Sequence, residues 1–315
     1  MISDRRRTGE RTTVAARTAA SPSALAATAA DTDARLFINS LEKGFLVLRA
    51  FGEVQRAMTI AEIASATGLG RSATQRLVYT LHRLGYLRRD PMSRCFMPTA
   101  KVLTLSYAYL RSDVLAELAS GFLGEIARMS EEAVSLSVLD DTDIIVVSRV
   151  PSRHASTLSV VQGMRFPAYC SAPGRAMLSA LPRPVAKDVI HRARLRRFTP
   201  YTIVERGRLL AEIERARQEG FAIAEQELYL RSLSVGVAVS GHDGMLVGAI
   251  NVFCPIDRWP ADRARRELVP LLVRQARELG ALCQAGFGAS AAPGKIAWSG
   301  PARLDGGGKV GVRFG

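Results

Sequence analysis

The sequence predicts an α+β protein with an N-terminal winged helix-turn-helix, a linker helix and a C-terminal domain built on an antiparallel sheet. Residues 59–97 read as two short helices joined by a turn and followed by a basic hairpin. Apolar residues at every second position recur between 134 and 253, which is the period of half-buried strands. Helical patterns between these strands predict that helices cover the sheet.

The helix-turn-helix carries clear boundary signals. Thr59 with Glu62 forms a capping box at the start of the first helix, and Gly68 ends it with a residue that tolerates positive φ. The second helix begins after a turn of three to four residues and stops at Gly85. Helical spacing predicts an inward face of Ala73, Leu77, Leu81 and Leu84. The outward face near its start then carries Arg71, Ser72, Gln75, Arg76 and Tyr79.

This outward face suits a helix that enters the major groove of DNA. Gln75 matches the bidentate pairing with adenine, and Arg71 matches the pairing with guanine. Ser72 and Arg76 are better placed for phosphates, which position a protein without specifying sequence. The pattern therefore predicts double-stranded DNA as the partner.

The hairpin after the second helix is basic, because it carries Arg88, Arg89 and Arg94 for the DNA backbone or a minor groove. Without these arginines, the pattern would also fit any pair of packed helices with a solvated face. The net charge of +14 and the pI of about 10.4 favour an anionic partner. Residues 36–99 contain nine basic and four acidic residues. Residues 192–208 are rich in arginine as well.

Several classes of protein are disfavoured. The four cysteines are scattered and no histidine cluster accompanies them, so no metal or other cofactor is expected, and reduced cytoplasmic thiols are the default. No apolar run is long enough to cross a membrane, and none follows Arg5–Arg7 to make a signal peptide. Residues 1–35 and 286–315 have the composition of disordered tails.

Two further helices flank the helix-turn-helix, whose domain is expected to span residues 36–98. One begins at Asn39 or Ser40 and ends at Gly52, with one apolar face. That face is formed by Leu41, Phe45, Leu48 and Phe51. The other lies within a linker of residues 99–112 and is apolar on more than one side, which is typical of a helix that packs against a second chain. A two-fold dimer would present two helix-turn-helix domains to a pseudo-palindromic operator.

The remaining residues, 113–285, are expected to form the second domain. Its first helix spans about 113–129. Strands are expected around 134–138, 144–147, 158–160, 235–239 and 246–253, with hairpin turns at 140–143 and 242–244. Further helices are expected around 173–180, 185–193, 204–219 and 260–284. The last of these has a face formed by Leu268, Leu271, Leu272, Leu279 and Leu282.

The order of these parts, and several strings within them, resemble the IclR family of bacterial transcriptional regulators. The resemblance covers roughly residues 37–284. It is carried by FINSLEKGFLVLRAF, TIAEIASATGLGRSATQRLVYTLHRLGYL, VLDDTDIIVVSRVPSR, FPAYCSAPGRAMLSALP, EQELYLRSLSVGVAV and AINVFCP. The first string and LTLSYAYLRS look most like the branch that regulates aromatic-acid catabolism, including protocatechuate and para-hydroxybenzoate regulators.

The resemblance implies a homodimer or homotetramer that binds DNA and senses a small organic acid in a GAF-like C-terminal domain. It places the effector site at Ser171, Ala172, Pro173, Gly174, Glu225, Glu227, Ser232, Asn251 and Phe253. This chain departs from the family pattern at Pro173 and Phe253, and in a shorter run between Gln226 and Arg231. The location of the pocket therefore carries over better than its selectivity.

The residues themselves also support this location. Pro173 suits the first turn of a helix, so the N–H groups of Ser171, Ala172 and Gly174 are expected to be free for a carboxylate. Ala172 and Gly174 are expected to let a ligand approach the backbone. Arg149 and Arg153 supply positive charge if they face inward. The alternative is that this string is simply a well-capped helix start.

Two other functions remain as alternatives. Cys170 with a histidine would make a thiol-dependent enzyme, but nothing in the sequence brings His154, His191 or His242 to it. A DNA-compacting protein of the nucleoid would sense nothing, and the large second domain disfavours it. The sequence therefore favours a DNA-binding regulator that is not an enzyme and that responds to a small organic acid, with an aromatic acid as the favoured class.

Overall fold

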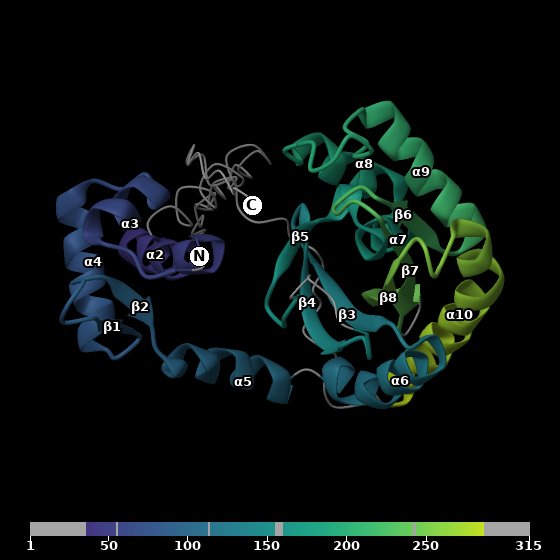
Figure 1. The fold of residues 1–315 in the computed structure, drawn as a ribbon, viewed down its shortest axis with the longest axis horizontal. Helices are drawn as coiled ribbons and strands as arrows, with labels where there is room; N and C mark the ends of the chain where they lie inside the picture. Colours follow the sequence, from purple (N-terminus) through teal and green to yellow (C-terminus); the bar gives the residue numbers. More distant parts are fainter. Residues whose placement is uncertain (1–35, 55, 113, 155–159, 242–243, 287–315) are drawn as a thin grey trace, which may run out of the picture. The chain divides into compact units, whose positions relative to one another are not determined.

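The computed structural model describes residues 36–54, 56–112, 114–154, 160–241 and 244–286. The chain divides into two compact units between Met97 and Pro98 (Figure 1). The two tails expected to be disordered lie outside the described residues, apart from Gly286. No helix in the described ranges has both the length and the apolar character that a membrane crossing requires.

The N-terminal unit is a winged helix-turn-helix, as predicted. It consists of α2 (Asn39–Val54), α3 (Ile60–Thr67), α4 (Arg71–Arg83), β1 (Leu87–Arg89) and β2 (Phe96–Pro98). The capping box is present: the Glu62 N–H donates to Thr59 Oγ1 at 3.3 Å, and the Thr59 N–H donates to Glu62 Oε2 at 2.8 Å. Gly68 and Gly85 have φ of 69° and 79°, so each ends its helix as expected.

The inward face of α4 differs from the prediction. Ala73 and Leu84 are exposed, whereas Thr74 and Val78 are buried. A threonine occupies a core position here because its hydroxyl donates to the Gly70 carbonyl at 3.1 Å, which satisfies the buried polar group. Apolar spacing alone misses such a position.

Helix α2 also differs. It continues past Gly52, which is not in the left-handed region, and ends at Val54. Of the predicted face, Phe51 is buried and Leu48 packs against the core, but Leu41 and Phe45 are exposed. Val47 and Ala50 complete the buried face.

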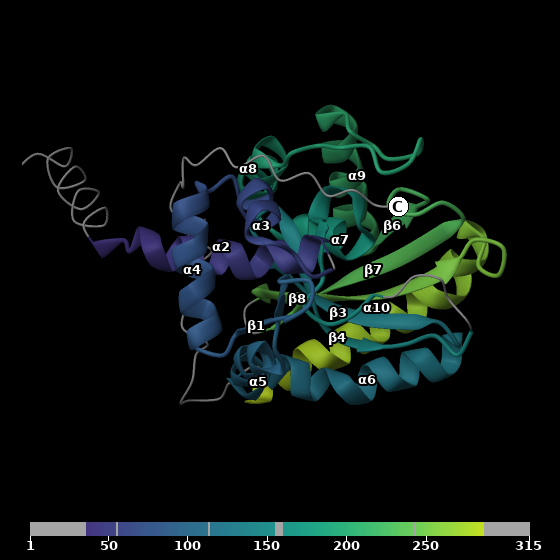
Figure 2. The same ribbon diagram turned by 60° about the vertical axis from the view of Figure 1, so that its left-hand side comes forward.

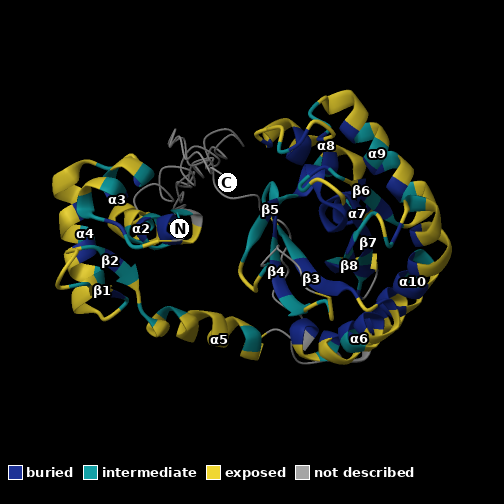
Figure 3. Cartoon of the chain, viewed as in Figure 1, coloured by how far each residue is buried: buried dark blue, intermediate teal, exposed yellow. Residues whose placement is uncertain are grey.

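The linker begins with a short 3₁₀ turn, Ala100–Val102, and continues as α5 (Leu103–Ser112). None of the residues of α5 is buried within this chain (Figure 3). Its exposed large apolar side chains are Leu103, Leu105, Tyr107 and Tyr109. The helix predicted here is therefore present, with its apolar side chains uncovered.

The C-terminal unit is an antiparallel sheet with helices on both faces. The strand order is β5-β4-β3-β8-β7-β6. The strands are β3 (Ala133–Asp140), β4 (Asp143–Val150), β5 (Arg165–Pro167), β6 (Ala222–Glu225), β7 (Ser232–Ser240) and β8 (Leu246–Pro255). Helices α6 (Val114–Ser130) and α10 (Ala261–Gly286) cover one face (Figures 1 and 2). Helices α7 (Ala172–Ala180), α8 (Arg183–Arg192) and α9 (Arg206–Glu219) cover the other.

Side-chain alternation on β7 serves both faces. Leu233, Val235 and Val237 join the core beneath α6 and α10. Between them, Ser234 and Gly236 face α7, where a Cβ on Gly236 would lie 2.6 Å from the Ala172 carbonyl carbon. Small residues on this face therefore let the start of α7 lie directly on the sheet.

Two expectations for this unit need comment, and two of its strands were not expected. The strand expected at 158–160 lies mostly outside the described residues, and Val160, the one described position, is not in a strand. The edge strands are instead β5 and β6, which are too short to show an alternating pattern. On α10, Leu282 is exposed whereas Leu268, Leu271, Leu272 and Leu279 are buried.

Candidate functional site

The first candidate site is the exposed face of α4. Arg71, Ser72, Gln75, Arg76 and Tyr79 are all exposed, whereas Thr74 and Val78 of the same helix are buried. The N-cap residue Gly70 makes no side-chain hydrogen bond to the first turn. The helix therefore presents its N-terminal turn and five polar or aromatic side chains to solvent.

The hairpin arginines are exposed as well. Arg88 and Arg89 lie on β1, and the Arg89 guanidinium lies 5.8 Å from the centre of the Phe96 ring. Arg94 is in the turn with φ of 58°. Asp90 fixes this turn by accepting the Met92 N–H at 2.9 Å, and this hydrogen bond lowers the pKa of Asp90. Arg88, Arg89 and Arg94 are thus displayed by a structured turn.

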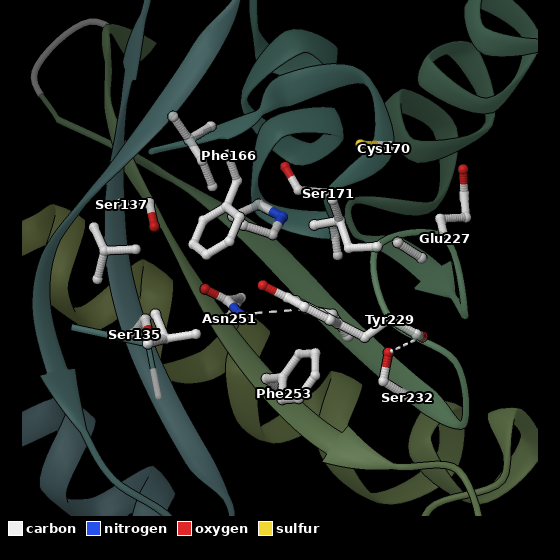
Figure 4. A pocket seen from close by; sticks show the side chains of 18 of the residues that line it. Ser135, Ser137, Phe166, Cys170, Ser171, Glu227, Tyr229, Ser232, Asn251 and Phe253 are labelled. Atoms are coloured by element: carbon white, nitrogen blue, oxygen red, sulfur yellow. Dashed lines mark hydrogen bonds between the residues drawn. The ribbon is translucent and has the colours of Figure 1, made fainter. Parts of the chain in front are cut away.

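The second candidate site is a cavity of about 560 Å³, including space open to solvent, between the sheet and the start of α7 (Figure 4). Its walls are mainly apolar, through Ile144, Val146, Val160, Phe166, Ala224, Leu228 and Phe253. Its polar lining consists of Ser135, Ser137, Arg149, Ser171, Glu227, Tyr229, Ser232, Ser234 and Asn251.

Most of the predicted effector residues line this cavity. They are Ser171, Ala172, Pro173, Glu227, Ser232, Asn251 and Phe253. Glu225 does not line it, because this residue is exposed at the end of β6. Gly174 does not line it either: a Cβ there would lie 2.3 Å from the Ala168 carbonyl oxygen. Gly174 therefore admits the chain's own backbone rather than a ligand.

The start of α7 offers fewer free N–H groups than expected. The Ser171 N–H donates to the Ala168 carbonyl at 3.5 Å, and the Gly174 N–H donates to Ser171 Oγ at 3.3 Å. Within the described chain, only the Ala172 N–H of the three has no acceptor. The expected three-donor carboxylate site is therefore wrong, and another group must supply most of the attraction for an anion.

Glu227 is not a free carboxylate. Arg175 Nη1 lies 2.6 Å from its Oε1, and both side chains are buried. The Ile203 N–H also donates to Glu227 Oε2 at 3.1 Å, and Arg175 Nε donates to the Tyr169 carbonyl at 2.8 Å. Sequence reasoning missed Arg175. This pair fastens the segment between β6 and β7 to α7 and neutralises Glu227.

Arg149 reaches the cavity because of a β-bulge. Ser135 pairs with Arg149 but Ser137 pairs with Val146, so β4 has an extra residue, Val147, at this point. The bulge reverses the alternation. Arg149 therefore joins Val146 on the cavity side, while Val147 packs beneath α6 and α10.

Arg149 is the one cation that lines the cavity among the described residues and has no acidic partner there. Its Nη1 donates to Ser135 Oγ at 3.1 Å, and burial lowers its pKa. Arg153 does not line the cavity, since its side chain is 67% exposed and lies 3.9 Å from Glu131. The expectation that the side chain faces into the cavity is met for Arg149 and is wrong for Arg153.

The sequence analysis missed several lining residues. Ser135 and Ser137 alternate with Leu136, so the period-two pattern already placed them on one face of β3. Tyr229 and Leu228 lie in the segment after β6, whose path depends on the Arg175–Glu227 pair. No sequence pattern indicated them.

Cys170 does not have the surroundings of a nucleophile. Its side chain is 1% exposed, and burial raises its pKa far above the usual value. Its Sγ lies 3.8 Å from the Pro167 carbonyl, and no described histidine contacts it. Nor does any group of three or more His, Cys, Asp or Glu residues suited to a metal occur in the described ranges.

Comparisons with known proteins find relatives for both parts of the chain. The family model for the bacterial transcriptional regulator IclR C-terminal domain matches residues 107–281, and the model for the IclR helix-turn-helix domain matches residues 40–91. The chain is 32% identical to the Pca regulon regulatory protein of Pseudomonas putida, over 77% of this chain and 83% of that protein. It is 31% identical to the p-hydroxybenzoate hydroxylase transcriptional activator of Acinetobacter baylyi, over 77% of this chain and 91% of that protein.

Two solved structures extend the comparison. A transcriptional regulator from Rhodococcus sp. RHA1 is 32% identical, with a TM-score of 0.67, and the match covers 79% of this chain and 99% of that one. The inducer-binding domain of PobR from Acinetobacter, a double mutant in complex with 3-hydroxybenzoic acid, is 27% identical with a TM-score of 0.50. That match covers 54% of this chain and 99% of the PobR chain.

Proposed function

Because the chain belongs to the IclR family of bacterial transcriptional regulators, we propose that its cavity binds a small aromatic acid that controls how tightly the protein binds its operator. The protein is a DNA-binding regulator with a C-terminal sensing domain, as its family is.

The observation that carries the proposal is the position of Arg149. A half-buried guanidinium without an acidic partner in the described chain is costly unless an anion joins it. Its planar fork suits a carboxylate. We therefore assign the carboxylate of the effector to Arg149, beside Ser135, and its apolar body to the walls formed by Ile144, Phe166 and Phe253.

An aromatic body is supported by the lining and by the relatives. The flat rings of Phe166 and Phe253 contribute to the cavity walls. Two similar proteins regulate the Pca regulon and p-hydroxybenzoate hydroxylase, and the PobR domain was solved with 3-hydroxybenzoic acid. In this chain we assign effector contacts to Ser171, Ala172, Pro173, Ser232, Asn251 and Phe253. Glu227 does not contact the effector in this proposal; through its ion pair with Arg175 it positions the cavity wall that contains Leu228 and Tyr229.

DNA is read by α4 and the hairpin in this proposal. Gln75 and Arg71 face bases, while Ser72, Arg76 and Tyr79 lie beside them for the backbone. Arg88, Arg89 and Arg94 contact phosphates or a minor groove. The protein is a homodimer or homotetramer on a pseudo-palindromic operator, and the uncovered apolar side chains of α5 support pairing there.

We divide the chain into a DNA-binding domain at 36–98, a linker at 99–112 and an effector domain at 113–285. The linker relays ligand binding, because an effector must bind the DNA-competent and incompetent arrangements with different affinities. The protein works in the cytoplasm, where its DNA is, and needs no cofactor. The family's members are regulators rather than enzymes, and the burial of Cys170 supports the absence of thiol catalysis.

Isothermal titration of the full chain with benzoate and hydroxybenzoates tests the effector class. Arg149→Gln should weaken binding about 10- to 100-fold, because a charge-assisted hydrogen bond contributes about 1.5–3 kcal/mol. Arg153→Gln is the matched control, since Arg153 lies outside the cavity and should leave affinity unchanged. Equal affinity of wild type and Arg149→Gln for the acid would show that Arg149 does not bind the effector carboxylate.

A further inference from the structure

Positive charge is concentrated on the C-terminal unit at a place outside the cavity. Residues 183–208 contain eight lysines and arginines but only two acidic residues, Asp188 and Glu205. Neither the operator reading nor the sensing uses this charge. From it we propose that the C-terminal unit also binds DNA, through phosphates of the duplex. This inference goes beyond the proposed function and does not depend on the effector.

Four cations of this stretch are exposed and have no acidic partner among the described residues. They are Lys187, Arg194, Arg206 and Arg208, and we call these four residues the basic surface. Other arginines nearby are neutralised, since Arg183 pairs with Glu214, and Arg192 pairs with Asp141 and Asp188. Several unneutralised cations on one surface raise the local positive potential, which attracts an anionic partner.

The basic surface is one patch because the end of α8 meets the start of α9. Arg206 Nη2 donates to the His191 carbonyl at 3.4 Å. His191 lies one turn after Lys187 on α8, with its Nδ1 2.7 Å from the Lys187 carbonyl oxygen. Arg194 follows α8 by two residues, and Arg208 shares the first turn of α9 with Arg206.

The segment between α8 and α9 is held firmly by the rest of the unit. The buried Tyr169 donates its hydroxyl to the Arg196 carbonyl at 2.6 Å and accepts the Arg196 N–H at 2.8 Å. Thr202 Oγ1 donates to the Glu227 carbonyl at 2.6 Å, and Arg197 Nη1 donates to the Thr202 carbonyl at 3.2 Å. Binding a partner at the basic surface therefore costs little ordering of the backbone.

The start of α9 is basic against the preference of an isolated helix. Arg206 and Arg208 occupy its first turn, which has no acidic residue, and the N-cap residue Glu205 makes no side-chain hydrogen bond to it. Cations are unfavourable there because the helix dipole places partial positive charge at the N-terminus. A local rule that is broken without a compensating ion pair points to a function for the charge.

The phosphate backbone of DNA is the partner that this charge fits. The protein binds DNA already, and a duplex carries one negative charge per about 1.7 Å of its axis. Because both units belong to one chain, DNA held by the helix-turn-helix is at high effective concentration for the C-terminal unit. Weak phosphate contacts therefore add to the affinity. An acidic protein surface is the alternative, and the test separates the two.

The test compares two triple variants of the full chain that lose the same charge. Arg194→Gln/Arg206→Gln/Arg208→Gln removes the arginines of the basic surface. Arg128→Gln/Arg266→Gln/Arg277→Gln is the matched control. It removes three exposed arginines of α6 and α10, which cover the opposite face of the sheet (Figure 2) and whose arginines at these positions also lack an acidic partner within the described ranges. Fluorescence anisotropy over a salt series measures binding to the DNA upstream of the gene and to a scrambled duplex.

The basic-surface variant should bind both duplexes more weakly by the same factor, because phosphate contacts carry no sequence information. Its slope of log K against log salt should be shallower by about two to three for each bound subunit, since each phosphate contact contributes about 0.9. Lys187→Gln alone should reduce the slope by about one. The control variant should keep the wild-type slope. All these side chains are exposed, so the melting temperature should not change.

Equal slopes in wild type and in both triple variants would overturn the inference and leave an acidic protein surface as the partner. An equal reduction in the two triple variants would overturn it as well, because only the net charge would then matter. A loss confined to the upstream DNA would show that these arginines read sequence rather than phosphates, which also contradicts the inference.

Discussion

Arg175 Nη1 lies 2.6 Å from Glu227 Oε1, and the two side chains are 2% and 5% exposed. The two residues are 52 positions apart in the chain. Their pairing holds the segment that carries Tyr229 and Leu228 against the start of α7, so one ion pair shapes a wall of the cavity.

Removing one partner of this pair should destabilise the protein strongly. Arg175→Met or Glu227→Gln leaves the other group buried without its partner, which costs about 3–5 kcal/mol. Urea unfolding followed by circular dichroism measures the loss. Arg183→Met is the control, since its pair with Glu214 is at the surface and should contribute little. A Glu227→Gln protein as stable as wild type would contradict the structural role given to this pair.

Variants of α4 and of the hairpin should separate sequence reading from phosphate binding. Gln75→Ala should cost about 1–3 kcal/mol on the preferred operator and relax base choice at one position. Arg88→Ala should instead weaken all sequences alike and reduce the salt slope of log K by about one. Anisotropy titrations on an operator and on scrambled DNA over a salt series give both quantities. An unchanged sequence preference in Gln75→Ala would place the reading face elsewhere.

The capping box should make the N-terminal unit sensitive to acid. Hydrogen bonds from Arg56 and Thr59 lower the pKa of the partly exposed Glu62 from 4.5 to about 2. Because the folded-state pKa is the lower one, ionised Glu62 stabilises the fold above about pH 4.5, and this contribution is lost as the pH falls toward 2. The difference in melting temperature between wild type and Glu62→Gln should therefore shrink over this interval. A constant difference from pH 7 to pH 2 would contradict this assignment.

The four cysteines should react unequally. Burial raises the pKa of Cys170 and Cys254, so both should resist iodoacetamide near neutral pH in the folded protein. Cys95, on the hairpin, is only half-buried and should react first. Peptide mass spectrometry after timed alkylation measures each rate. Rapid modification of Cys170 would indicate an activated thiol and reopen the enzyme alternative.

The local features were predictable from sequence because their causes are local. Thr59, Glu62 and Gly68 mark helix ends within a few residues, and the alternation of Val235 and Val237 reflects a sheet buried on both faces. The buried Thr74 was missed because its hydroxyl bonds within its own helix, which makes a polar residue compatible with the core.

The cavity was only partly predictable because its geometry depends on distant pairings. Arg149 turns inward through a bulge that exists only when β3 and β4 pair, and no alternation within β4 reveals it. The Arg175–Glu227 pair joins α7 to the segment after β6, which no local pattern indicates. The sequence therefore located the cavity through Ser171 and, by resemblance, Asn251, and it offered Arg149 as an inward charge, but it missed Arg175 and the bulge that turns Arg149 inward.

The most direct test of an acid-responsive, sequence-specific regulator is fluorescence anisotropy of the full chain on the DNA immediately upstream of its own gene. Scrambled DNA is the reference, and the hydroxybenzoates and other acids are added in turn. Wild type should prefer the upstream DNA by about a thousandfold, and one acid should shift that affinity.

Arg149→Gln should bind the same DNA in the absence of acid but respond only at much higher acid concentration. Equal binding of wild type to upstream and scrambled DNA, with a steep salt dependence and no response to any acid, would contradict both the operator reading and the sensing.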